Sequence, residues 1–79
     1  MTDWRLQGQE RYLQSLELYL ATYKAPREGW DHDHCEFCFG KFAEHGGDFS
    51  EGYTSKDRYH WICKNCYDDF KTMFGWKIA

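Results

Sequence analysis

Apolar residues in the first third of the chain recur at the spacing of an α-helix. They stand three or four positions apart, at Leu13, Leu16, Leu20 and Tyr23. One face of a helix presents such a stripe, and Lys24 followed by Pro26 is a typical helix end. The pattern therefore predicts a helix over residues 3–24 that packs its apolar face on the rest of the chain.

The rest of the chain alternates short apolar runs with turn residues. In chain order it predicts a turn-rich linker over residues 25–34, a knuckle and strand over 35–42, a glycine-bearing acidic loop over 43–51 and a hairpin over 52–62. A second helix is expected from Lys64, because Cys66, Phe70 and Met73 with Phe74 recur on one helical face. Together with the N-terminal helix, these elements predict a small α+β fold.

Two CxxC pairs carry the strongest chemical signal. They are Cys35-x-x-Cys38 and Cys63-x-x-Cys66, and 24 residues separate them. Two thiolates across a tight turn can fill two corners of a tetrahedral Zn²⁺ site, and a hairpin brings the second pair to complete it. Thioredoxin-like redox pairs sit in a βαβ setting, which this sequence does not suggest. We therefore predict one structural zinc ion held by these four cysteines, with no open position for a catalytic water.

The order of knuckle, hairpin and helix predicts a treble-clef-like zinc finger over residues 30–79. The second CxxC pair is expected to open a helix, where free N–H groups point at the sulfurs. Gly40 stands two residues after Cys38, with Phe39 between them. This departure from the usual pattern leaves the knuckle geometry open.

A chain of this length benefits from the additional stability that a bound metal ion supplies. The chain has 79 residues and a mass of 9.6 kDa, so residues 1–79 are predicted to form a single zinc-binding domain. A domain of this size buries a small core and usually needs a metal or disulfides for stability. Aromatic residues make up 20% of the chain, which suits a small core because each ring buries a large area. Trp61 is expected to be buried beside the finger.

The charge distribution favours a protein partner over nucleic acid. The formal net charge is −3, and residues 25–55 carry seven acidic against two basic residues. Nucleic-acid-binding modules usually carry a basic field, so nucleic acid is a weak candidate. An acidic face toward a basic protein surface would consist of Asp31, Asp33, Glu36, Glu44, Asp48 and Glu51. The alternative is that these acids only keep a small domain soluble.

The sequence carries no signal for export or for a membrane. Its N-terminus has an acid at position 3 and no apolar segment of a secretory signal. No stretch approaches the roughly 20 apolar residues that a membrane span requires. A cytoplasmic protein is therefore expected, and in that compartment paired cysteines are metal ligands more often than disulfides.

The histidines leave alternatives open. His34 and His60 are expected to pack beside the sulfurs, and either one could replace a cysteine ligand. The DHDH run over residues 31–34 is similar to that of HNH-type nucleases, in which His32 or His34 would act as general base beside a second divalent metal. In such nucleases a CxxC pair usually precedes the histidines, whereas here both pairs follow them. A zinc-deaminase pattern fails because Ile62 replaces its proline.

Four longer runs resemble a family of small bacterial hypothetical proteins. These runs are DWRLQGQERYL, GWDHDHCEFC, GYTS and YHWICKNCYDDFKTMFGW. The family shares a DWRLxGQE start, a WDHDHCEFC element and a YHWICxxC end, and the resemblance covers nearly the whole chain. It implies a bacterial cytosolic zinc-binding protein with Cys35, Cys38, Cys63 and Cys66 as ligands, and it implies no particular activity. The expected function is a non-enzymatic interaction module, regulatory or immunity-like, and the alternatives are an HNH-type nuclease and a nucleic-acid-binding zinc finger.

Overall fold

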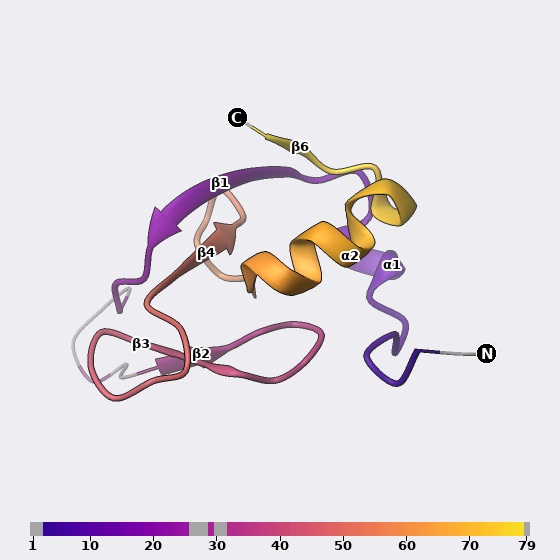
Figure 1. The fold of residues 1–79 in the computed structure, drawn as a ribbon. Coiled ribbons are helices and arrows are strands. Elements are labelled where there is room, and N and C mark those ends of the chain that lie inside the picture. Colours follow the sequence, from indigo (N-terminus) through magenta and orange to yellow (C-terminus); the bar gives the residue numbers. More distant parts are fainter. Residues whose placement is uncertain (1–2, 26–28, 30–31, 79) are drawn as a thin grey trace.

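Short strands and two helices make up the described part of the chain. The computed structural model describes residues 3–25, 29 and 32–78 (Figure 1). Its elements are α1 (Glu10–Leu13), β1 (Glu17–Thr22), β2 (His32–His34), β3 (Lys41–Ala43), β4 (Glu51–Thr54), β5 (Trp61–Ile62), α2 (Lys64–Phe74) and β6 (Lys77–Ile78). This mixture confirms the predicted α+β class. Among these residues, neither helix has the length and apolar character needed to cross a membrane.

Two small sheets organise the elements. In the larger sheet β4 lies between β5 and β1, which are both antiparallel to it, and β6 joins the other side of β1 in parallel. Figure 1 shows the yellow β6 running alongside β1. β2 and β3 form a separate antiparallel pair. The hairpin predicted over residues 52–62 is confirmed as β4 and β5 with a turn between them.

The predicted helix over residues 3–24 is wrong. Only Glu10–Leu13 is helical, and Glu17–Thr22 forms the strand β1. Ser15 adopts a left-handed backbone with φ of 63°, which stops helical progression between the two elements. The leucines also face different environments, because Leu18 is fully buried whereas Leu20 is 51% exposed.

Sheet neighbours on both sides explain why β1 is a strand. Its residues 19–22 pair with β4 along one edge and its residues 17 and 18 pair with β6 along the other, so each residue has a hydrogen-bonding neighbour strand. Helix propensity is a weak preference that such pairing overrides. As a result, the N-terminal third contributes a strand to the sheet that holds β4 and β5, instead of a helix packed on it.

The predicted linker over residues 25–34 also contains a strand. His32–His34 pair with Lys41–Ala43, and His32 lies opposite Ala43. The sequence of β2 is entirely polar and does not alternate with apolar residues, so the sequence pattern could not predict this strand. Its pairing with β3 in the structure identifies it. Other residues of the predicted linker lie outside the described part of the chain: Pro26, Trp30 and Asp31.

One aromatic cluster connects the knuckle to α2. Phe37 is fully buried, and its ring centroid lies 4.9 Å from that of Phe70, 5.4 Å from that of Phe74 and 5.8 Å from that of Trp76. The indole N–H of Trp76 donates to the carbonyl of Leu13 at 2.8 Å. This cluster therefore joins the start of the finger, the helix and the end of α1.

A second cluster surrounds the buried Trp61, as the sequence predicts. Its ring lies 5.0 Å from that of Tyr23 and 5.3 Å from that of Phe42. Gly52 permits this packing, since a Cβ there would lie 2.7 Å from both the Ile62 carbonyl oxygen and the Phe42 ring. The close approach of β4 and β5 to Phe42 requires a residue without a side chain at this position.

Candidate metal centre

The first cysteine pair lies on the tight turn between β2 and β3. The carbonyl of Cys35 accepts a hydrogen bond from the Phe39 N–H at 3.1 Å, and the Cys35 N–H donates to the Gly40 carbonyl at 2.8 Å. Phe39 adopts a left-handed backbone with φ of 63°, a conformation in which glycine is far more common. The residues predicted as a knuckle are thus a turn, and its left-handed position falls on Phe39 instead of Gly40.

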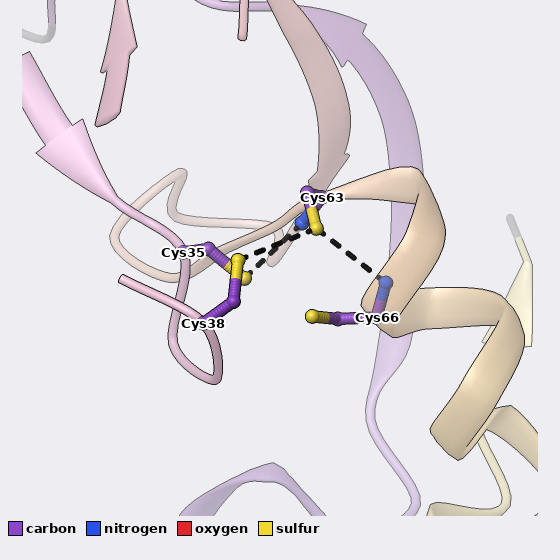
Figure 2. Close-up of side chains that lie close together, drawn as sticks. All are labelled: Cys35, Cys38, Cys63 and Cys66. Atoms are coloured by element: carbon purple, nitrogen blue, oxygen red, sulfur yellow. Dashed lines mark hydrogen bonds between the residues drawn. The ribbon is translucent and has the colours of Figure 1, made fainter. Parts of the chain in front are cut away.

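The second cysteine pair opens α2, as predicted. Cys63 is the N-cap residue, and its Sγ accepts a hydrogen bond from the Cys66 N–H at 3.4 Å (Figure 2). Cys66 lies in the first turn of the helix, so both sulfurs lie near free N–H groups that favour negative charge. β5 leads directly into Cys63, and its pairing with β4 fixes the position of the helix start.

The four sulfurs converge on one point. All four Sγ atoms lie within 4.8 Å of one another, and those of Cys38 and Cys63 are 3.8 Å apart (Figure 2). A tetrahedral site with metal–sulfur bonds of about 2.3 Å places its sulfurs about 3.8 Å apart. Cys35, Cys63 and Cys66 are buried, and Cys38 is half-buried. The four predicted ligands can therefore hold one metal ion.

Hydrogen bonds to the sulfurs favour one thiolate within the group. The Sγ of Cys35 accepts from the N–H groups of Phe37 (3.5 Å) and Cys63 (3.4 Å). Hydrogen bonding from the Cys63 thiol, helped by these N–H groups, lowers the pKa of Cys35. The same contact raises the pKa of Cys63, and burial followed by the charge of Cys35 raises the pKa of Cys66 to about 12. A metal ion between the sulfurs would favour the thiolate forms of Cys63 and Cys66, because metal ligands must be deprotonated.

The described histidines lie outside the cluster of cysteine sulfurs. Within the described ranges, the group of close potential ligands holds the four cysteines and no histidine. This arrangement differs from the alternative in which His34 or His60 replaces a cysteine. His32 and His34 lie on β2 with their ring centroids 4.9 Å apart. Asp31, the first residue of the DHDH run, lies outside the described residues.

His60 is connected to the finger through a carboxylate that the sequence did not suggest. Its Nδ1 lies 2.7 Å from one oxygen of Glu36, and the Tyr12 hydroxyl donates to the other oxygen at 3.3 Å. Glu36 follows Cys35 in the knuckle, so this contact ties the β4–β5 turn and α1 to the first cysteine pair. His60 thus contacts a carboxylate next to Cys35 in sequence, and its expected packing beside the sulfurs stays a prediction.

Arg5 is a residue near the sulfurs that sequence reasoning missed. Its Nη1 donates to the Sγ of Cys66 at 3.5 Å, across 61 positions of sequence. Arg5 lies in the DWRLQGQERYL run, but no spacing in that run relates it to a cysteine. Only the folded arrangement reveals this contact.

Comparison with known proteins adds no assignment, because no family model, no curated protein and no solved structure matches the chain. The resemblance to small bacterial proteins therefore stays a prediction.

Proposed function

We propose that the protein is a structural-zinc module in which Cys35, Cys38, Cys63 and Cys66 hold one Zn²⁺. The convergence of four sulfurs within 4.8 Å supports this proposal. Thiolates are soft ligands that disfavour Mg²⁺ and Ca²⁺, and a tetrahedral set of four sulfurs suits zinc or iron. Of these two metals, zinc has no redox chemistry and therefore needs no electron-transfer partner. It is commonly bound by four cysteine thiolates in structural sites.

The role proposed for zinc is to hold the fold together. Four protein ligands close the coordination shell, so no position is left for a substrate or a catalytic water. Bound zinc would join the β2–β3 turn to the N-terminus of α2 in a treble-clef-like arrangement. In small domains the free energy of metal binding becomes free energy of folding. The protein we propose is therefore non-enzymatic and cytosolic, and it belongs to the bacterial family that its sequence resembles.

Native mass spectrometry of the reduced protein tests the identity and number of the metal. We expect one zinc per chain and loss of folded structure when a chelator removes it, because the sulfurs then repel one another on ionisation or must take up protons. Far-UV circular dichroism follows the fold, and added zinc is expected to restore it. Iron in place of zinc, or a chelated protein with unchanged ellipticity, contradicts the proposal.

We further propose that the module binds a protein with a basic surface. Five of the six acids in the predicted acidic face already contact groups of this chain. Their partners are the Tyr23 hydroxyl for Asp33, the His60 ring for Glu36, the Ala25 N–H for Glu44, the Lys41 N–H for Asp48 and the Lys64 ammonium for Glu51. Asp31 lies outside the described residues. A carboxylate with one hydrogen-bond donor still has free lone pairs, so exposed Glu44 and Asp48 are the best candidates for external contacts.

The double substitution Glu44→Gln/Asp48→Asn tests this surface. Affinity capture with the native chain is expected to retain a basic protein at low salt and to lose it at high salt, because salt screens exposed charges. The double variant is expected to lose that protein at low salt as well. Glu10→Gln, which removes an exposed acid on α1, is the matched control and is expected to behave as the native chain. Equal retention by the double variant contradicts the acidic surface.

The nuclease alternative stays a prediction. It depends on His32 or His34 acting beside a second metal. These histidines lie on β2 opposite Ala43 and Lys41, and within the described ranges they do not gather with a third potential ligand. Among the described residues, the convergence of the four sulfurs supports the structural-zinc module instead.

A further inference from the structure

The N-terminal segment reaches the metal centre through Arg5. Its Nη1 atom donates to the Sγ of Cys66 at 3.5 Å and to Asp69 Oδ2 at 2.9 Å. Both acceptors belong to α2, one in the first turn and the other one turn later. The guanidinium therefore lies between a sulfur of the site and a carboxylate on the same helix.

Other contacts fix the orientation of this guanidinium. Its Nε and Nη2 atoms donate to the two carboxylate oxygens of Asp3, at 3.0 and 2.7 Å. Its carbon Cζ stands 4.5 Å from the centroid of the Phe70 ring, and only 16% of the side chain is exposed. Planar guanidinium groups lose little additional freedom when such a fork and a stacking contact already hold them.

A second connection holds the same segment against the knuckle. Gln9 is 3% exposed, and its side-chain N–H groups donate to the carbonyls of Arg5 at 2.7 Å and of Glu36 at 3.0 Å. Glu36 is the neighbour of Cys35. Residues 3–9 thus contact the segments of both cysteine pairs, through the Gln9 side chain at the Glu36 carbonyl and through the Arg5 guanidinium at α2.

We propose that Arg5 is the charge-compensating partner of the metal centre, and that zinc binding and docking of residues 3–9 therefore favour each other. This inference rests on the proposed zinc site. Four thiolates around one Zn²⁺ leave a formal charge of about −2 in a largely buried place. A charge-assisted hydrogen bond from Arg5 to Cys66 offsets part of that charge, and it also separates the sulfur from the carboxylate of Asp69.

Zinc affinity of the full chain tests the proposal by competition with a chromophoric chelator. Loss of a hydrogen-bond partner of a metal ligand typically weakens metal binding by about 10- to 100-fold, and we expect Arg5→Ala to fall in this range. Arg5→Lys keeps the positive charge and is expected to lose less affinity. Arg11→Ala removes an arginine from the exposed face of α1 and is expected to bind zinc as tightly as the native chain.

Asp69→Asn separates charge compensation from a mere ion pair. This variant removes the carboxylate partner of Arg5 but leaves the guanidinium beside Cys66, so zinc affinity is expected to stay at the native level or to rise. If Arg5 acted only through its ion pair with Asp69, Asp69→Asn would lose as much affinity as Arg5→Ala. That result would overturn the proposal.

Cobalt substitution gives a readout at the sulfur itself. A hydrogen bond to a thiolate lowers the energy of its lone pairs, so its loss in Arg5→Ala moves the sulfur-to-Co²⁺ charge-transfer absorption to longer wavelength, whereas Asp69→Asn leaves it in place. If the native chain binds no metal, the zinc site itself fails. If it binds zinc tightly and Arg5→Ala matches it in affinity and in the cobalt spectrum, only the role of Arg5 fails.

Discussion

Replacement of Cys63 by serine is expected to abolish tight zinc binding and to leave the chain largely unfolded. Cys63 has three roles at one position. Its Sγ is one of the four converging sulfurs, the same Sγ caps α2 by accepting from the Cys66 N–H, and its own N–H donates to the Sγ of Cys35. Serine can still cap a helix, so the expected loss comes from the metal and not from the cap.

The expected size of this effect follows from the free energies involved. Structural zinc contributes apparent binding free energies of about 10–16 kcal/mol in small zinc-finger peptides. A single core in a chain of this size rarely supplies more than about 3–5 kcal/mol. Losing most of the free energy of zinc binding therefore removes more stability than the aromatic core supplies, so the folding equilibrium shifts to the unfolded state.

Circular dichroism and zinc stoichiometry of Cys63→Ser check this expectation. Asn65→Ala is the matched control, because Asn65 is exposed in the same first turn of α2, between the two ligands. It is expected to keep one zinc and the native spectrum. A Cys63→Ser protein that is helical and resists chelators would show that the fold does not depend on the metal.

Local signals sufficed for the two cysteine-bearing turns and for α2, because these features depend on near neighbours. The CxxC spacing predicts a turn with two sulfurs on one side, and Cys63 caps α2 while Cys66 lies in its first turn. Phe70 and Phe74 fall on the buried face of that helix at the predicted spacing, whereas Met73, predicted on the same face, is 60% exposed. Gly75, with φ of 65°, ends the helix in the left-handed conformation that favours glycine. Each of these features is encoded within about one helical turn of sequence.

Distant pairing explains what the sequence did not reveal. Residues 17–22 form a strand because β4 and the two-residue β6, near the other end of the chain, pair with them. A helix with an apolar stripe and a strand with Leu18 buried both place apolar residues of this segment in the core. The spacing of the apolar residues alone therefore could not distinguish a helix from a strand. The contacts of Arg5 with Cys66 and of His60 with Glu36 likewise join segments that no local pattern relates.

Substitution of Phe37 by alanine is expected to cause the largest loss of stability among changes that leave the four sulfurs in place. Phe37 lies between the two cysteines of the knuckle, and it is fully buried against the rings of Phe70, Phe74 and Trp76. Removal of a buried phenylalanine ring costs about 3–5 kcal/mol, since apolar contacts are lost and a cavity remains. The aromatic cluster and the metal then no longer position α2 together.

Phe39 provides the matched comparison, two residues further along the same turn. Its side chain is 53% exposed, so Phe39→Ala removes a ring of the same size with an expected change of no more than about 0.5 kcal/mol. Denaturant unfolding at a fixed, saturating zinc concentration measures both variants, because bound metal adds to the apparent stability. Equal losses for the two variants would show that the cluster around Phe37 does not hold the knuckle on α2. A loss of stability in Phe37→Ala but not in Phe39→Ala would show that the aromatic cluster around Phe37 stabilises the zinc-bound fold in addition to the metal.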